Sequence, residues 1–267
     1  MEKIAVIAGE GKLPFLLIGK IKERGQLPVI LALEGIADKR ITQQAHPVYW
    51  LQIGELKKML STLKKEVVGK LIFSGRVDKR LVFESPGVDG RIERLLRQME
   101  DKGDRSLLRT LAGIFEREGI KLVSPYEYLS SYIVNPGVLS KREPSSQEMA
   151  DIRFGWNIAK NIANLDIGNT VVVKEGIILA VECVEGTDST IIRGGKLGGR
   201  GSVVVKVARD NQQSRFDHPP VIGLTTCKVC SSVGIFTIGF EAGKTILLEK
   251  EVLLQECNSR NIALVGL

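Results

Sequence analysis

The stretch Lys3-Ile-Ala-Val-Ile-Ala-Gly9-Glu-Gly-Lys-Leu-Pro14 decides how the first half of this chain folds. Its apolar start predicts a strand buried on both faces, and the glycine-containing loop predicts a tight turn into a helix over residues 14–24 that ends at Gly25. Residues 28–33 are again apolar and predict a second buried strand. This order of elements predicts a βαβ unit with parallel strands.

The same alternation of strand and helix patterns continues to about residue 124. The further predicted elements are strands over residues 48–51, 70–73 and 121–123 and helices over residues 55–65, 89–99 and 104–118. We therefore predict an α/β fold whose N-terminal domain is Rossmann-like, with a mostly parallel sheet covered by helices. Ligands of such sheets bind at the carboxyl ends of the strands.

The stretch Leu165-Asp-Ile-Gly-Asn-Thr-Val-Val-Val-Lys-Glu-Gly-Ile-Ile-Leu-Ala-Val-Glu-Cys-Val-Glu-Gly-Thr-Asp188 is the most informative part of the second half. It predicts two strands joined by a Lys174-Glu-Gly176 turn and followed by the polar tetrad Glu185-Gly-Thr-Asp188. A rigid hairpin can deliver such polar groups to one place, which favours a site. The alternative is structural, because Thr187 or Asp188 could simply cap a helix over residues 189–193.

The chain changes character between residues 130 and 146, where turn-forming and polar residues predominate. We predict a domain over residues 1–131, a linker over residues 132–145 and a C-terminal α+β domain over residues 146–267. The predicted elements of that last domain, besides the hairpin, are helices over residues 146–163, 226–232 and 250–259 and strands over residues 202–207, 221–224, 236–238, 245–248 and 262–265. Ser145 or Ser146 is placed to cap the first of these helices.

The composition is that of a globular protein, with 267 residues, 43% hydrophobic and 26% charged. Apolar runs such as residues 4–8 are far shorter than the roughly 18 residues that span a bilayer, and the N-terminus shows no signal-peptide pattern. A cytoplasmic protein is expected. The pair Cys227-Lys-Val-Cys230 has no second pair to complete a zinc site, and buried thiols are a more common use of cysteine than redox chemistry.

The net charge of +7 is concentrated in residues 1–131, which hold 23 Lys and Arg against 17 Asp and Glu, whereas the remainder holds 15 against 14. A positive field suits nucleotides, phosphorylated substrates or an anionic membrane surface. Only 5% of residues are aromatic, and no nucleic-acid-binding motif or long basic run occurs. Nucleic acid is therefore not an expected partner.

Carboxylates are the available catalytic groups, because the chain has only two histidines, His46 and His218. The candidates in the second half are Asp151, Asp166, Glu182, Glu185, Asp188, Asp217 and Glu241. Oxygen ligands suit Mg²⁺, which commonly serves phosphoryl chemistry. For Asp217, an Asx turn or an ion pair with Arg215 is the structural alternative.

Three glycine-containing segments could contact phosphate. Gly9 to Gly11 and Ser74-Gly75 each follow a predicted strand, where backbone amides and a helix N-terminus can face an anion. The first lacks the third glycine of G-x-G-x-x-G, so a tight turn is an equal alternative. Arg193-Gly-Gly-Lys-Leu-Gly-Gly-Arg-Gly201 predicts a mobile segment whose cations close over an anion, or simply a flexible surface loop.

Taken together, several strings resemble the LpxI family of UDP-2,3-diacylglucosamine pyrophosphatases over nearly the whole chain. They are Ile7-Ala-Gly-Glu-Gly-Lys-Leu-Pro14, Phe73-Ser-Gly-Arg-Val77, Gly103-Asp-Arg-Ser-Leu-Leu108, Asp151-Ile-Arg-Phe-Gly155, Leu165-Asp-Ile-Gly168, the run from Ala180-Val-Glu182 to Glu185-Gly-Thr-Asp188, Gln212-Gln-Ser-Arg-Phe-Asp217 and Glu241-Ala-Gly243. Some positions depart from the family pattern: Arg105, Asn169, Arg209-Asp210, and one extra residue between Asp217 and Gly223.

The resemblance implies a cytoplasmic enzyme of lipid A synthesis that hydrolyses UDP-2,3-diacylglucosamine to UMP and 2,3-diacylglucosamine 1-phosphate (lipid X) with Mg²⁺, by attack of water on the sugar-side phosphorus. It implies that Asp217 is catalytic and that Asp217 and Asp188 bind the metal. The implied substrate-binding residues are Gly9, Gly11, Leu13, Pro14, Ser74, Gly75, Asp104, Asn169, Glu185, Gly186, Thr187, Asp188 and Lys206. Peripheral contact with the inner membrane is a further expectation, and a homodimer is expected from base rates alone.

Two other classes of function use the same features. A non-catalytic module that senses nucleotide sugars would use the same glycine loops but would tolerate neutralisation of Asp217. A nucleotide-sugar transferase would need an acceptor and would release UDP rather than UMP. The identity of the products distinguishes the three.

Overall fold

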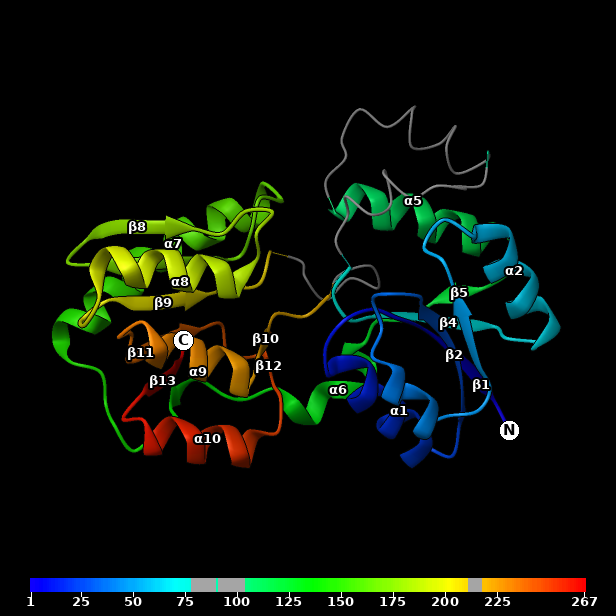
Figure 1. Ribbon diagram of the computed structural model, residues 1–267, viewed down its shortest axis with the longest axis horizontal. Coiled ribbons are helices and arrows are strands. Elements are labelled where there is room, and N and C mark those ends of the chain that lie inside the picture. Colours follow the sequence, from blue (N-terminus) through cyan, green and yellow to red (C-terminus); the bar gives the residue numbers. More distant parts are fainter. Residues whose placement is uncertain (78–89, 91–103, 211–217) are drawn as a thin grey trace. The chain divides into compact units, whose positions relative to one another are not determined.

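The computed structural model describes residues 1–77, 90, 104–210 and 218–267 (Figure 1). The chain forms two compact units, whose described residues fall within Met1–Leu129, with His218, in the first and within 130–210, with Pro219–Leu267, in the second. The helix predicted over residues 89–99 falls almost entirely outside the described residues. No helix in the described part of the chain is long and apolar enough to cross a membrane.

The first unit is built on a five-stranded sheet in the order β3-β2-β1-β4-β5, in which all pairs are parallel. The strands are β1 (Lys3–Ala8), β2 (Leu27–Leu33), β3 (Val48–Leu51), β4 (Lys70–Ser74) and β5 (Lys121–Leu122). The chain runs outward from β1 to β3 and then crosses back to β4, which is the doubly wound order. The predicted Rossmann-like sheet is confirmed.

Helices cover both faces of this sheet (Figure 1). On one face α1 (Leu13–Glu23) packs against α6 (Tyr126–Leu129), and on the other lie α2 (Leu56–Lys65) and α5 (Asp104–Arg117). A short 3-10 turn, η1 (Lys39–Gln43), follows β2, and the Asp38 carboxylate caps it by accepting from the amide of Arg40. Because both faces are covered, the central strands are apolar throughout.

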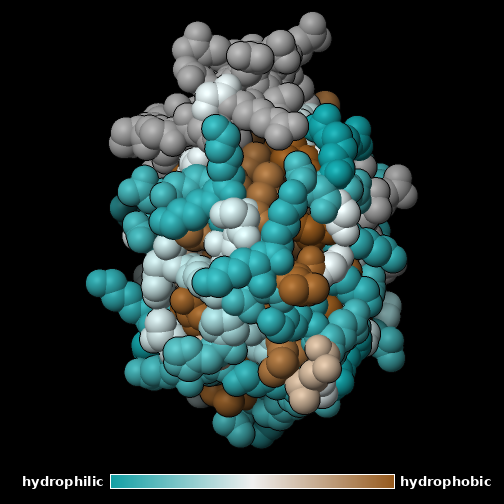
Figure 2. All heavy atoms as spheres, turned by 90° about the vertical axis from the view of Figure 1, so that its right-hand side faces the viewer, coloured by the Kyte–Doolittle hydropathy of each residue, from teal (hydrophilic) through white to brown (hydrophobic). Residues whose placement is uncertain are grey.

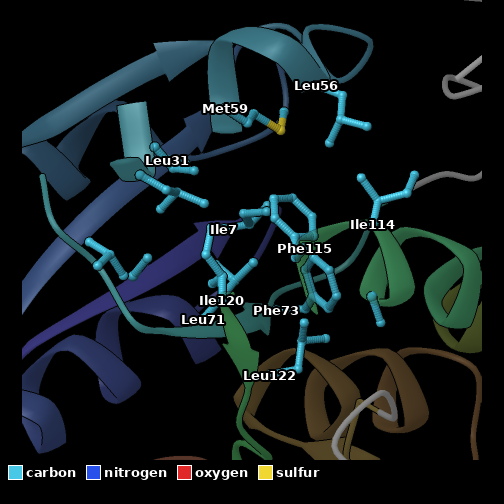
Figure 3. Close-up of a cluster of buried hydrophobic side chains, with 14 of the residues drawn as sticks. Ile7, Leu31, Leu56, Met59, Leu71, Phe73, Ile114, Phe115, Ile120 and Leu122 are labelled. Atoms are coloured by element: carbon cyan, nitrogen blue, oxygen red, sulfur yellow. The ribbon is translucent and has the colours of Figure 1, made fainter. Parts of the chain in front are cut away.

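A core cluster of this unit lies under α2 and α5 (Figure 3). Phe73 of β4 and Phe115 of α5 meet edge to face, with ring centroids 6.1 Å apart, and Ile7 and Leu31 of the neighbouring strands join them.

Figure 2 shows the side of the molecule that lies to the right in Figure 1, where hydrophilic residues cover most of the surface and hydrophobic ones show between them.

The second unit is built on a mixed six-stranded sheet in the order β6-β13-β11-β9-β7-β8. The strands are β6 (Gly137–Val138), β7 (Thr170–Lys174), β8 (Ile177–Val181), β9 (Val203–Lys206), β11 (Thr237–Phe240) and β13 (Ala263–Gly266), with a separate parallel pair of β10 (Val221–Ile222) and β12 (Ile246–Leu247). Strands β9, β11 and β13 are parallel, whereas β7 is antiparallel to both of its neighbours.

One long helix, α7 (Ser146–Asn164), covers one face of this sheet, and α8 (Thr187–Gly198), α9 (Leu224–Ser232) and α10 (Lys250–Ser259) pack on the other. The predicted cap of α7 is present as a capping box, in which the Ser145 hydroxyl accepts from the amide of Glu148 and the Glu148 carboxylate accepts from the amide of Ser145. The fold class expected from the sequence is confirmed, with a parallel sheet in the first unit and a mixed sheet covered by helices in the second.

Residues 132–145, predicted as a linker, contribute to the second unit. The short 3-10 turn η2 (Ser130–Tyr132) leads to β6, which pairs with β13 at the sheet edge. The Arg142 guanidinium donates to the Phe236 carbonyl and forms an ion pair with Glu148. This segment is thus held by backbone pairing and by buried polar contacts.

Candidate functional site

The two glycine loops of the first unit meet at the carboxyl ends of β1 and β4. The amide of Gly9 donates to the Ser74 carbonyl at 2.8 Å, and Glu10 and Arg76 exchange two backbone hydrogen bonds. These neighbouring strands are the point at which the order of the sheet reverses, and ligands of doubly wound sheets bind at such a point.

Two of these glycines are required by the packing of one loop on the other. A Cβ on Gly9 would lie 2.5 Å from the Arg76 carbonyl oxygen, and one on Gly75, which has a φ of +89°, would lie 2.8 Å from the Glu10 carbonyl oxygen. Gly11 has a φ of +99° and open space around it. The tight-turn alternative therefore accounts for Gly9 and Gly75 without any ligand.

The loop after β1 leads directly into α1, whose N-cap residue, Lys12, makes no side-chain capping bond. Leu13 and Pro14 are buried, so at these positions only the backbone can approach a ligand. The Ser74 side chain is also buried, and its hydroxyl has no hydrogen-bond partner among the described residues. Asp104 is the first residue of α5, and its side chain lies outside the described part of the structure.

In the second unit, three polar residues lie side by side at one end of neighbouring strands. Thr170, the first residue of β7, is the register partner of Lys206, the last residue of β9. Glu182 directly follows β8, and its amide donates to the Thr170 carbonyl at 2.9 Å. Directly paired residues of adjacent strands point to the same face. We call Lys206, Thr170 and Glu182 the strand-end row.

The row points to the face covered by α8, because alternate residues of a strand share a face and Val172 and Val204 pack with Ile191 of that helix. Thr187, the first residue of α8, joins the row: its hydroxyl donates to Glu182 Oε1 at 2.8 Å and accepts from Lys206 Nζ at 2.6 Å. The predicted hairpin therefore does deliver polar groups to one place.

The alternative in which Thr187 or Asp188 caps α8 is wrong. The N-cap residue is Gly186, with a φ of +82°, and no side chain of the described residues caps the helix. Because the first amides of a helix lack partners within it and carry its positive dipole end, the start of α8 is favourable for an anion. Lys206, which is only 6% exposed, adds a buried positive charge to it.

Glu182 balances that charge. Burial raises the pKa of Glu182, but the Lys206 charge and hydrogen bonds from Asn169, Thr170 and Thr187 outweigh burial and lower the pKa below its usual value. The amide of Asn169 donates to Glu182 Oε2 at 3.0 Å. Gly168 explains the close approach, because a Cβ there would lie 2.3 Å from the Glu182 carbonyl oxygen.

Glu185 and Asp188 lie at the rim of this arrangement. The Glu185 carboxylate accepts from Arg193 at 2.6 Å and from the Thr190 hydroxyl at 3.3 Å. Desolvation raises the pKa of Glu185, but the Arg193 contact and the other hydrogen bonds lower it overall. Asp188 is exposed in the first turn of α8, where a carboxylate complements the helix dipole.

The prediction that residues 193–201 form a mobile loop is wrong, because most of them belong to α8. A Cβ on Gly194 would lie 2.5 Å from Val172, one on Gly195 2.3 Å from Val233, and one on Gly198 2.2 Å from Leu179. These glycines allow the helix to lie close to the sheet and to α9. Their density reflects helix packing rather than flexibility. Lys196 is part of the helix, and Arg200 lies in the turn that follows it.

Other candidate carboxylates have structural roles. Asp151 is 1% exposed and accepts from the amides of Glu175 and Gly176, so it fixes the predicted turn between β7 and β8. Asp166 forms an ion pair with Arg209. Glu241 binds Lys160, which also contacts Asp210, and this holds the chain where it leaves β9.

Asp217, the predicted catalytic residue, lies outside the described residues, as does the rest of its motif back to Gln212. Within the part of the chain that the structure does describe, no group of three or more His, Cys, Asp or Glu is placed to hold a metal ion. The cysteines of the C-x-x-C pair are both buried in α9, where Cys227 contacts Cys257 of α10 with 3.3 Å between the sulfur atoms.

Sequence reasoning included Lys206 and Thr187 in the site, named Glu182 only as a candidate carboxylate and missed Thr170. The signal for the missing member was the hairpin itself. Thr170 begins the first strand of the hairpin and Glu182 directly follows the second, so the pairing of the two strands makes these residues neighbours.

The fold and these sites define a two-domain α/β protein with a doubly wound N-terminal sheet. It belongs to the LpxI family: the model of the LpxI N-terminal domain matches residues 3–132, and that of the LpxI C-terminal domain matches residues 135–265. A relative from Caulobacter vibrioides, named UDP-2,3-diacylglucosamine pyrophosphatase LpxI, is 30% identical over 277 residues that cover 100% of this chain and 98% of the relative.

Similarity to solved structures is weak. A UDP-glucose-4-epimerase from Stenotrophomonas maltophila with bound NAD and formylated UDP-arabinopyranose matches with a TM-score of 0.29 and 17% identity over 45% of this chain and 35% of that one. The biotin carboxylase subunit of a pyruvate carboxylase matches with a TM-score of 0.30 and 15% identity over 69% and 39%. Neither supports a conclusion about function.

Proposed function

We propose that this protein hydrolyses the pyrophosphate bond of UDP-2,3-diacylglucosamine to UMP and 2,3-diacylglucosamine 1-phosphate in lipid A synthesis. The observation that carries the proposal is the full-length match to the Caulobacter relative, whose name states this activity. Both family domains are matched in order, which excludes a relationship through one domain alone.

In the proposed reaction, the oxygen of a water molecule bonds to the sugar-side phosphorus while the bond from that phosphorus to the bridging oxygen breaks. UMP leaves with the bridging oxygen, and the water gives up a proton. The family resemblance implies that Asp217 is catalytic, and we propose that its carboxylate accepts this proton. The remaining requirement is positive charge where negative charge develops on the phosphate oxygens.

The second unit supports the last requirement. Lys206 places a buried ammonium group beside the uncapped start of α8, and electrostatic interactions are stronger in such a low-dielectric setting than in water. We propose that Lys206 and the first amides of α8 bind a phosphate group of the substrate. The proposed site around this phosphate group also includes Asn169, Glu185, Gly186 and Asp188.

We propose that the first unit binds the nucleotide at the carboxyl ends of β1 and β4. Backbone groups of Gly9, of Gly11 and of the start of α1 can bind a ligand there, as can the Ser74 hydroxyl. The side chains of Leu13 and Pro14 are buried in the core and cannot. The proposal relies on the switch point of the sheet, where doubly wound proteins bind nucleotides. Asp104 is a proposed member by the family resemblance.

Magnesium is part of the proposal through the family resemblance. Of the two proposed ligands, Asp188 is described and exposed, but it has no second and third carboxylate or histidine around it among the described residues. The described residues therefore do not form a ligand set, and no step above depends on the metal. When bound, Mg²⁺ would neutralise charge on the substrate phosphates.

The test is to incubate the purified full chain with UDP-2,3-diacylglucosamine and Mg²⁺ and to identify the products by mass spectrometry. The proposal expects UMP and the lipid monophosphate. Release of UDP would indicate a transferase, and binding without conversion by folded protein would indicate a sensing module. A parallel reaction with EDTA, followed by excess Mg²⁺, tests the metal requirement.

Peripheral contact with the inner membrane is proposed from the lipid substrate and from the basic excess of residues 1–131. Flotation with vesicles tests it. Binding that requires anionic lipid and weakens with salt is expected, and equal recovery with neutral vesicles would contradict an electrostatic contact.

A further inference from the structure

Glu182 has a buried carboxylate whose partners are all groups of the proposed phosphate site. It is 8% exposed, and its two oxygens accept from Thr187 and from the amide of Asn169. An ionised carboxylate only accepts hydrogen bonds. The single proton of the Thr187 hydroxyl is therefore directed at Glu182, and the hydroxyl oxygen faces Lys206 as an acceptor.

This arrangement decides which of the two groups, Thr187 or Lys206, can donate to an anion. Thr187 has already used its only proton, so its hydroxyl cannot donate to a phosphate oxygen while Glu182 holds it. The Lys206 ammonium has three protons, and it donates to Thr187 at 2.6 Å and to Thr170 at 3.4 Å. The chain from Glu182 through Thr187 thus fixes where the ammonium lies and which way it is turned.

We propose that Glu182 is a positioning residue for the hydrolytic reaction: it holds Lys206, through Thr187, in the orientation that binds a substrate phosphate. This inference rests on the proposed function, and it adds a residue to which the family resemblance assigned no role. A buried cation without its counter-charge is costly, so Glu182 has both a structural and an orienting effect.

A matched control separates these two effects. Glu148 is also a buried, ion-paired carboxylate of the second unit, 7% exposed and held by Arg142, Thr237 and the amide of Ser145. Its partners belong to the segment that leads into α7 and to β11, and none of them belongs to the proposed site. Glu148→Gln therefore removes a comparable carboxylate without touching Lys206.

The first experiment compares Glu182→Gln, Glu182→Asp and Glu148→Gln in turnover per folded molecule. Interactions that strengthen in the transition state affect kcat more than KM. We expect Glu182→Gln to lower kcat about tenfold or more with a KM change below about threefold, and Glu182→Asp to recover part of the loss. Glu148→Gln should lower Tm but retain kcat. Equal kcat in Glu182→Gln and wild type would overturn the proposal.

The second experiment does not require turnover. The side-chain ¹⁵N signal of Lys206, assigned by its loss in Lys206→Met, should be resolved in wild type and in Glu148→Gln but broadened or shifted in Glu182→Gln. If wild type fails to hydrolyse the substrate, the proposed function falls, and this signal then decides only whether Glu182 holds Lys206 in place. An unchanged Lys206 signal in Glu182→Gln would overturn it.

Should Glu182→Gln fail to fold, the double variant Glu182→Gln with Lys206→Met removes both buried charges and is expected to regain Tm. Its kcat should equal that of Lys206→Met alone, because Glu182 acts only through Lys206. A further drop in kcat below that of Lys206→Met would show that Glu182 acts on the reaction by another route, which would overturn the proposal.

Discussion

Lys206 Nζ lies 2.6 Å from the hydroxyl oxygen of Thr187, although the two residues are 19 positions apart in the chain. The contact follows from the strand register. Because β7 pairs with β9, Lys206 lies next to Thr170. Helix α8 begins at Thr187, so its first residue contacts Lys206. A buried cation at an uncapped helix start is therefore a consequence of the fold.

Lys206→Met should reduce turnover by roughly a hundredfold, the scale of losing one electrostatic donor in an active site. Methionine fills similar space, so the loss comes from the charge, and Lys206→Arg should recover little because the site is buried. The measurement is kcat of the folded variant. Lys174→Met is the control. Lys174 is a lysine of the same sheet, and its ammonium group donates to the Gly198 carbonyl at the end of α8. Equal effects of both substitutions would remove Lys206 from the site.

The glycines of α8 give a prediction about stability. Gly194→Ala would place a Cβ 2.5 Å from Val172, and overpacking of this kind costs about 1–3 kcal/mol. Gly19→Ala in α1 is the matched control, because nothing lies within 4 Å of its Cβ position and alanine favours a helix by up to about 1 kcal/mol over glycine. The free energy of unfolding measured in urea should therefore fall for Gly194→Ala and rise for Gly19→Ala. A stabilising Gly194→Ala would contradict the close packing of α8.

The acid side of the stability curve should depend on Glu182 and Glu148. Burial raises the pKa of each, but the Lys206 charge in one case and the Thr237 hydrogen bond in the other help to lower it below the unfolded value. A group with a lowered folded pKa contributes its stability above the unfolded pKa, about 4.3 for glutamate, and loses it as pH falls through the folded pKa. The free energy of unfolding should thus fall below about pH 4.

The variant that combines Glu182→Gln with Glu148→Gln checks this prediction. Its free energy of unfolding should be lower than that of wild type at pH 7, and it should change less between pH 5 and the acid limit, because two of the titrating groups are gone. Parallel pH curves for the two proteins would mean that these carboxylates do not have lowered pKa values.

The first unit could be predicted closely because its signals are local. Apolar runs such as residues 4–8 and 28–33 predict strands that are buried on both faces, and Pro14 and Gly25 mark the helix between them. The capping pair Ser145 and Glu148 is equally local. Such patterns depend on the nearest few residues, so one sequence is sufficient to interpret them.

The glycine-rich residues 193–201 could not be interpreted in this way. Composition alone favours a flexible loop, whereas the need for Gly194 and Gly195 comes from Val172 and Val233, which are distant in the chain. The pairing of Lys206 with Glu182 across Thr187 has the same origin, because it depends on which strands are neighbours. Asp217 was assigned by family resemblance alone, and its role stays a prediction.

Asp217→Asn should reduce turnover by roughly a hundredfold or more, because asparagine keeps the size of the side chain but cannot accept the proton of the attacking water. The measurement is a pair, kcat and Tm on the same variant. If Asp217 instead caps a turn or pairs with Arg215, Tm should fall while turnover per folded molecule stays near normal, and that result would remove it from the catalytic role.

The most direct test of the central claim is the fate of heavy oxygen during hydrolysis. Purified protein should convert UDP-2,3-diacylglucosamine in ¹⁸O-labelled water to UMP and the lipid monophosphate, with one ¹⁸O in the lipid phosphate and none in UMP, as measured by mass spectrometry. Label in UMP alone would contradict attack at the sugar-side phosphorus. Folded protein that forms neither product would contradict the proposed function itself.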